Sequence, residues 1–184
     1  PFCETFFDDV RIPRPNLVGK ENQGWTIAKK LLQHERNMVA GMGTRGKTKN
    51  PANKMENQAK QYVGEIDGKI ASASLREGIA RHQMNSIAFA LTLRRSSEEA
   101  KTTSAPSPAS SMFKYYGTEQ NKNRFEILLD IMGSQSLGWE GDSFDPRELS
   151  TNREWLRSKA NSIEGGTSEV QLNIIAKRVL GLPD

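Results

Sequence analysis

Cysteine and histidine are scarce in this chain, which has one Cys and two His among 184 residues. A lone Cys3 cannot form an internal disulfide, and no spacing of Cys and His is typical of a zinc site. A reducing compartment, most simply the cytoplasm, is therefore expected. The chain also lacks any run near the roughly 18 apolar residues of a membrane helix, and its start is not typical of a secretory signal. We expect no membrane span.

Neither sign of charge is in large excess, because the chain has 26 Lys+Arg and 22 Asp+Glu residues. The most basic stretch holds Arg45, Lys47, Lys49 and Lys54, without interleaved aromatic residues or a nucleic-acid recognition motif. A solvated loop is the better interpretation, and no nucleic-acid partner is expected. Hydrophobic residues make up 35% of the chain, which supports one domain and a fragment of another.

The first residues predict a strand. Residues 4–12 are rich in β-formers and are followed by Pro13 and Pro15, which are typical of a chain leaving a sheet. No partner strand is predicted after residue 12, so a sheet before Pro1 would explain it. The absence of an initiator Met also indicates that the chain is part of a longer protein.

Most of the chain has apolar residues at helical spacing. A Ser74/Glu77 pair is typical of a capping box, and Gly181 followed by Pro183 is typical of a helix end. The sequence predicts an all-α antiparallel helical bundle. Helices are predicted at 25–42, 55–66, 74–100, 112–132, 155–160 and 169–180, with connectors at 44–54, 101–111 and 133–141.

Glu35 is the first candidate for chemistry, because it falls on the apolar face of the first helix. It lies four residues after Leu31, three before Met38 and seven after Ala28. Burial there would disfavour the charged form of the carboxylate, which is the tuning expected of a base that works near neutral pH. The alternative is a residue at the edge of the stripe that reaches solvent or a basic neighbour.

The second candidate is the run Gly165-Gly166-Thr167-Ser168-Glu169 before the last helix. Unsatisfied N–H groups at a helix start favour an anion, so a phosphate-bearing cofactor would fit. An ordinary capped helix, with Thr167 or Ser168 as the cap, explains the pattern equally well. Two adjacent glycines favour a ligand that approaches the backbone closely.

Two blocks of sequence resemble the acyl-CoA dehydrogenase family. Residues 6–25 and Glu35-Arg36 are similar to the family's junction between its middle β-domain and its C-terminal helical domain. The run from Ile163 to Leu182 is similar to the C-terminal signature. Within the family, the large subunit of pimeloyl-CoA dehydrogenases is the type that the chain resembles most. The resemblance implies that residues 1–20 end the middle β-domain and residues 21–184 form the helical domain.

This resemblance implies a flavoprotein that oxidises an acyl-CoA thioester to a trans-2-enoyl-CoA, with FAD as cofactor and an electron-transferring flavoprotein as partner. It also implies a dimer or tetramer, in which the helical domains pack together. The chain covers roughly half of a typical member, without the N-terminal domain and most of the flavin-binding sheet, so by itself it is expected to have little or no activity.

Family members carry the catalytic base at one of two positions. One position precedes the Gly-Thr of the C-terminal signature and is Gly165 here, while the other matches Glu35. The resemblance therefore implies Glu35 as base, with Glu164, one residue out of register, as runner-up. Thr167 and Glu169 match family positions that contact FAD, and Gly166 matches the glycine that lets FAD approach.

Two departures from the family pattern concern the flavin. The usual Arg-x-x-Phe-Gly element, whose Arg reaches the flavin pyrophosphate of a neighbouring subunit, is missing from residues 47–69. Asp130 occupies the position of a common Gln, and a carboxylate is a poor neighbour for a pyrophosphate. Either flavin binding is altered or a partner subunit of different sequence supplies the contacts. The alternative function is a non-catalytic partner subunit or oligomerisation module of a dehydrogenase complex.

Overall fold

The computed structural model describes residues 3–40, 51–99 and 109–183. These residues form helices joined by short connections, with one pair of very short strands. The elements are α1 (Gly24–Ala40), α2 (Pro51–Val63), β1 (Glu65–Ile66), β2 (Lys69–Ile70), α3 (Ala73–Glu99), α4 (Ala109–Met132), α5 (Pro146–Lys159) and α6 (Ser168–Ile174), which a π-helical turn extends (Ile175–Val179).

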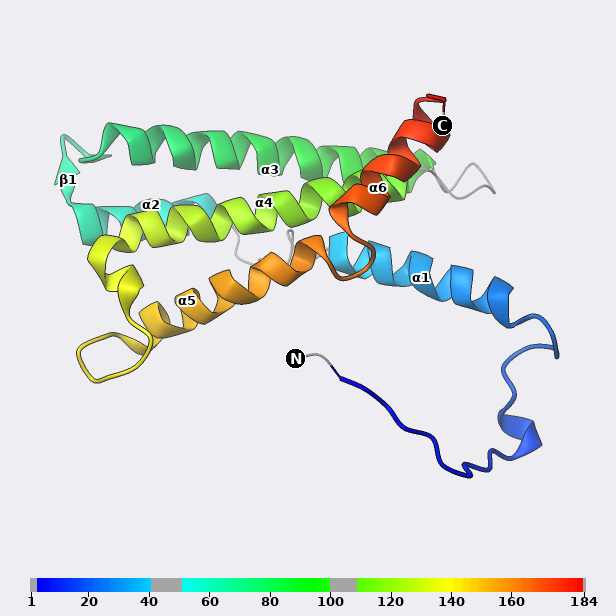
Figure 1. The fold of residues 1–184 in the computed structure, drawn as a ribbon. Coiled ribbons are helices and arrows are strands. Elements are labelled where there is room, and N and C mark those ends of the chain that lie inside the picture. Colours follow the sequence, from blue (N-terminus) through cyan, green and yellow to red (C-terminus); the bar gives the residue numbers. More distant parts are fainter. Residues whose placement is uncertain (1–2, 41–50, 100–108, 184) are drawn as a thin grey trace.

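Helix α4 is the centre of the bundle, because it packs against α1, α2, α3, α5 and α6. Helices α3 and α4 run side by side in opposite directions, and α5 runs back along α4 (Figure 1). The predicted all-α antiparallel bundle is therefore confirmed. Of the predicted connectors at 44–54 and 101–111, residues 44–50 and 101–108 lie outside the described residues, and the remaining residues belong to α2 and α4.

The core consists of two apolar clusters along α4. One is formed by Met55, Ala59, Ile70, Ile79, Ile127 and Ile131, which come from α2, β2, α3 and α4. The other joins Phe89 of α3 to Phe113 of α4, with ring centroids 6.1 Å apart in an edge-to-face arrangement. These clusters hold α2 and α3 against the central helix.

The buried face of α3 differs from the predicted one. Ile79 is buried as predicted, but the other buried residues are His82 and Phe89. Residues 84, 87 and 91, on the predicted face, are 60–70% exposed (Met84, Ile87 and Leu91). The prediction was wrong because α3 has apolar residues on two faces, and only the neighbours α2 and α4 decide which face is covered.

Residues 65–70 form a hairpin where the sequence predicted the end of a helix. Glu65 pairs with Ile70 and Ile66 pairs with Lys69. The two residues between them have positive φ, 50° for Asp67 and 76° for Gly68, as a type I′ turn requires. Asp-Gly between short extended segments is a strong hairpin signal, so the prediction of no strand after residue 12 was wrong.

The predicted strand at residues 4–12 is absent. The described residues before α1 form only a 3₁₀ turn (Arg14–Asn16), and Phe6 and Phe7 are about 80% exposed, at 82% and 78%. A strand needs a neighbour for its N–H and C=O groups, and no other described segment pairs with this one. The assignment of residues 1–20 to a β-domain stays a prediction.

Two helix starts also differ from the predicted ones. A capping box formed by Asp145 and Glu148, with Pro146 at the first helical position, starts α5 well before the predicted residue 155. At α3 the side chain of Ser72, not Ser74, accepts from a backbone N–H, that of Leu75. Helix α2 likewise begins at Pro51, inside the predicted connector.

A buried hydrogen bond ties α2 to the start of α5. The Tyr62 hydroxyl donates to Glu148 Oε1 at 2.6 Å, and Glu148 Oε2 accepts from the backbone N–H of Asp145 at 2.9 Å. Glu148 is only 7% exposed, so these donors replace much of the water that its carboxylate oxygens would otherwise bind. Desolvation, followed by the bond to Glu148, raises the pKa of Tyr62 to about 12.

We predict that Tyr62→Phe lowers the free energy of unfolding by about 1–3 kcal/mol, because it removes one donor from a buried carboxylate. Urea denaturation followed by circular dichroism measures the change. Tyr116→Phe is the matched control, since that ring packs on Phe89 and the structure shows no hydrogen bond for its hydroxyl among the described residues. Equal losses in the two variants would contradict this role of the Tyr62 hydroxyl.

Candidate functional site

Glu35 lies near the end of α1 and is half-buried. It shares a face with Ala28, which is also half-buried, and α1 packs against α4. Leu31, four residues before Glu35 on the same face, is 67% exposed, and Trp25 is 73% exposed. The predicted apolar face of α1 is thus only partly covered within the described residues.

Glu164, the runner-up base, is held in an ion pair. Its carboxylate accepts two bonds from the Arg157 guanidinium, at 2.7 and 3.4 Å, and one from the Asn161 side-chain amide. The bond from Arg157, with a smaller contribution from Asn161, lowers the pKa of Glu164 despite partial burial. A carboxylate whose charged form is stabilised in this way is a weaker proton acceptor.

The glycine turn before α6 is shaped by one close contact. Gly165 and Gly166 both have positive φ, 67° and 93°, a conformation that favours glycine. A Cβ at Gly166 would lie 2.5 Å from Nε2 of Gln171, which donates to the Gly165 carbonyl at 3.3 Å. The approach of Gln171 therefore favours glycine at position 166 in addition to the positive φ, a reason that the sequence did not reveal.

Thr167 caps α6, as one of the two sequence interpretations expected. Its Oγ1 accepts from the backbone N–H of Val170 at 3.3 Å. Glu169 follows in the first turn and is exposed, and its pKa is lowered by hydrogen bonds from its own backbone N–H and from Thr167. The turn therefore presents a hydroxyl and a carboxylate side by side.

The structure places the predicted residues in two groups. Glu164, Gly166, Thr167 and Glu169 lie together on the turn before α6, and Glu35 lies on α1. Both α1 and α6 pack against α4, which relates the two ends of the chain through one helix. Asp130, the departure noted in the sequence, is exposed in the last turn of α4.

The donor set of the turn fits part of a flavin. Thr167 and Glu169 can bond the ring edge or the hydroxyls of the side chain of FAD, but a carboxylate repels its pyrophosphate. Two cations near the turn are not available to bind the phosphates of FAD. Arg157 pairs with Glu164, and Lys114 is fully buried. Within the described residues, the turn can hold the uncharged part of the cofactor, and cations for the phosphates must come from elsewhere.

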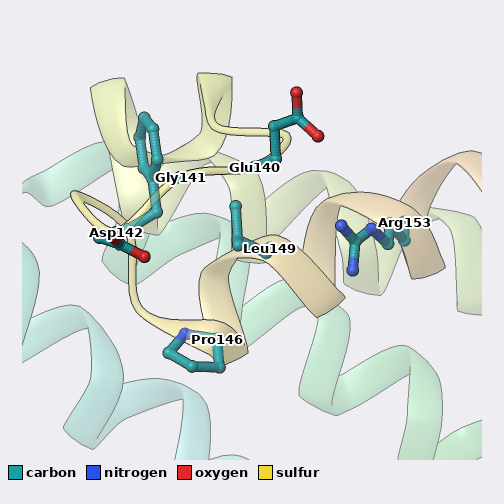
Figure 2. Close-up of a pocket in the computed structure, with 7 residues that line it drawn as sticks. Glu140, Gly141, Asp142, Pro146, Leu149 and Arg153 are labelled. Atoms are coloured by element: carbon teal, nitrogen blue, oxygen red, sulfur yellow. The ribbon is translucent and has the colours of Figure 1, made fainter.

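A shallow pocket lies apart from the predicted residues. It has a volume of about 430 Å³ and is lined by the loop before α5 and the first turns of that helix, including Phe144, Leu149 and Arg153 (Figure 2). The Arg153 guanidinium lies over the Trp139 ring, 5.2 Å from its centroid, and donates to the Trp139 carbonyl at 3.0 Å. Glu140 and Asp142 make the rim acidic.

Sequence reasoning missed two buried polar residues beside the turn, Lys114 and Gln171, which are 0% and 1% exposed. A signal for Lys114 existed: it lies three residues after Ser111 and four before Thr118, both buried on the same side of α4. A lysine at such a position is normally interpreted as a boundary residue, so spacing alone did not identify it.

Comparison with known proteins decides the family. The family model described as "Acyl-CoA dehydrogenase, C-terminal domain" matches residues 22–180. The chain belongs to the acyl-CoA dehydrogenase family. It is 30% identical over 183 residues to acyl-CoA dehydrogenase IpdE1 of Mycolicibacterium smegmatis, a match that covers 99% of this chain and 43% of that protein. The resemblance recognised in the sequence is thereby confirmed.

Solved structures of the family share the fold. The ChsE4-ChsE5 complex of Mycobacterium tuberculosis matches with a TM-score of 0.69 and 25% identity, over 97% of this chain and 45% of that chain. A glutaryl-coenzyme A dehydrogenase with glutaryl-CoA matches with a TM-score of 0.72 and 22% identity, over 97% and 43%, which shows the fold alone. The chain thus spans less than half the length of these family members, and the likeness to pimeloyl-CoA dehydrogenases stays a prediction.

Within the described part of the chain, no helix combines the length and the hydrophobicity of a membrane span. No cluster of three or more His, Cys, Asp or Glu side chains that could hold a metal ion occurs there.

We predict that Gly166→Ala destabilises the protein more than Gly141→Ala. Both positions have positive φ, so both substitutions cost about 1–3 kcal/mol in backbone strain. Only at Gly166 does the new methyl group meet another group, Gln171, whereas nothing lies within 4 Å of the Cβ at Gly141. Thermal unfolding measures the loss of stability in each variant. Adding Gln171→Ala to Gly166→Ala should remove the extra loss at Gly166. Equal losses in the single variants would contradict the close contact.

Proposed function

We propose that this chain is the C-terminal part of an FAD-dependent acyl-CoA dehydrogenase, which converts an acyl-CoA thioester to a trans-2-enoyl-CoA with Glu35 as the catalytic base. One observation carries the proposal: within a domain of this family, the residue that matches one of the two base positions lies half-buried on α1, a helix that packs against α4. Glu164 is the weaker candidate, because Arg157 and Asn161 already occupy its carboxylate.

The proposed role of Glu35 is to accept the α-proton of the thioester. As the C–H bond breaks, its electron pair forms the α,β double bond, and the proton stays on the Glu35 carboxylate until it is released to solvent. FAD, when bound, accepts the hydride from the β-carbon.

The glycine turn is proposed to hold the uncharged part of the flavin. Gly166 allows the turn its positive φ, and Thr167 and Glu169 offer a hydroxyl and a carboxylate as hydrogen-bonding groups. Gly165 takes the place that a base occupies in other family members. Without a side chain at that position, proton abstraction falls to a residue on another element, which is consistent with Glu35 on α1.

A second candidate function is that of a partner subunit that does no chemistry. The missing Arg-x-x-Phe-Gly element and Asp130 favour it, since both departures remove favourable contacts to a flavin pyrophosphate. The ChsE4-ChsE5 structure is a complex of two named chains, so a hetero-oligomer is a reasonable assembly for this one. The two functions differ in flavin content. A purified complete protein with about one flavin per copy of this chain supports the enzyme, and a homo-oligomer without flavin supports the partner subunit.

Partners of the complete protein follow from the same proposal. They are an acyl-CoA substrate, an electron-transferring flavoprotein as electron acceptor, and further subunits in a dimer, a tetramer or a hetero-oligomer. The exposed apolar residues of α3, among them Met84 and Leu91, support subunit contacts. The single exposed cysteine, Cys3, supports a reducing compartment, and we propose the cytoplasm.

We predict that Glu35→Gln in the complete protein lowers kcat by about 10²–10⁴-fold with acyl-CoA substrates, because the amide cannot accept the α-proton. The flavin spectrum should be unchanged. Stopped-flow reduction of the flavin by a panel of acyl-CoAs measures the effect.

Glu164→Gln is the matched control and should keep kcat within severalfold while weakening the pair with Arg157. Full activity of Glu35→Gln would remove this residue from the mechanism. A large loss in Glu164→Gln alone would assign the base to Glu164.

A further inference from the structure

Lys114 has an unusual position for a charged side chain. It lies in the first part of α4, is 0% exposed, and its Nζ has no hydrogen-bond partner among the described residues. An ammonium group has three N–H donors, and burying it without acceptors is costly. The side chain also does not reach solvent, as long lysines at a boundary usually do.

The charges around Lys114 belong to the glycine turn and to α4 itself. Glu164 and Glu169, on either side of the turn, and Glu119 favour the ammonium, while Lys122 opposes it. Burial outweighs them and lowers the pKa of Lys114. None of these carboxylates forms an ion pair with Lys114 in the described structure, because Glu164 is paired with Arg157 and Glu119 with Lys122.

Two further buried polar atoms on α6, Ser168 Oγ and Gln171 Oε1, have no hydrogen-bond partner among the described residues. They are three residues apart on α6 and therefore share a face of that helix, which packs against α4. The other end of the same Gln171 amide donates to the Gly165 carbonyl. Because α6 packs against α4, and because Glu164 and Glu169 beside the turn act on Lys114, we infer that the ammonium faces these two acceptors.

We propose that the Lys114 ammonium, the Ser168 hydroxyl and the Gln171 amide oxygen form one buried polar network, completed by ordered water, that fixes the position of the Gly165–Thr167 turn. Three carboxylates around Lys114 disfavour an anion as the bridging group, whereas water can bond a donor and two acceptors at once. Through Gln171, the network acts on the Gly165 carbonyl, so Lys114 is a positioning residue for the turn.

The functional consequence rests on the proposed function, in which this turn holds part of the flavin. A turn that is no longer fixed should bind the flavin more weakly without loss of the fold. The structural consequence does not depend on that proposal, because the mobility of the turn can be measured with or without dehydrogenase activity.

The test is amide hydrogen exchange of the complete protein, followed by mass spectrometry on fragments that cover residues 164–171. In Lys114→Met, which keeps the volume and removes the charge, exchange in these fragments should rise by about threefold to tenfold, because local opening becomes easier. Exchange in the α2 and α3 fragments should not change. Lys159→Met is the matched control, since that lysine lies on α5 and pairs with Glu126.

Coupling between the residues gives a second readout. Ser168→Ala, a milder change, should also speed exchange in residues 164–171, and in the double variant the two effects should not add if both residues belong to one network. If Lys114→Met does not fold, Ser168→Ala alone, compared with the exposed Ser150→Ala, decides the proposal. Unchanged exchange of the turn in the folded variants would overturn it, as would a rise spread equally over the whole chain.

Flavin binding is the third readout and separates the two proposals. If Lys114→Met makes the turn mobile and raises the flavin dissociation constant by about threefold or more, the result supports both the polar network and the role of the turn in flavin binding. A mobile turn with unchanged flavin affinity keeps the network and removes the turn from the flavin site. Loss of flavin with unchanged exchange at residues 164–171 overturns the positioning role of Lys114.

Discussion

The contact of α4 with every other major helix is the constraint on which the structure depends. Because α1, α2, α3, α5 and α6 all pack against it, α4 must bury residues on all sides. Its apolar residues fill the two core clusters, and its polar residues at Ser111, Lys114 and Thr118 are buried as well. A central helix of this kind relates Glu35 on α1 to the glycine turn before α6, although the two lie at opposite ends of the sequence.

Buried polar groups, more than apolar area, define how the elements outside the core are placed. Tyr62 and Glu148 join α2 to the start of α5, and Gln171 fixes the backbone of the glycine turn. In each case a side chain reaches a group far along the chain or across a turn, and the cost of leaving that group unpaired makes the arrangement specific. The turn that carries the glycines and hydroxyls of the family signature is therefore held in place by another side chain, that of Gln171.

The sequence predicted the helices and the family, but not which faces are covered. Apolar spacing is a property of one helix, so it located α1, α3 and α4 within a few residues. Burial depends on neighbours, and the predicted faces of α1 and α3 are largely exposed at Trp25 and Met84. Asp145/Glu148 and Asp67-Gly68 are local signals that indicate a helix start and a hairpin in the sequence itself. Lys114 could not be predicted, because no single-helix pattern shows that a cation is enclosed.

Trp25 can serve as a fluorescent reporter of the exposed side of α1. It is 73% exposed on the same helix as Glu35, while the half-buried Trp155 lies on α5 and the partly exposed Trp139 precedes that helix. Indole emission shifts to shorter wavelength when water is removed from the ring. The emission maximum and the quenching of Trp25 by iodide therefore report whether α1 becomes covered when substrate, flavin or another subunit is added, without any attached dye.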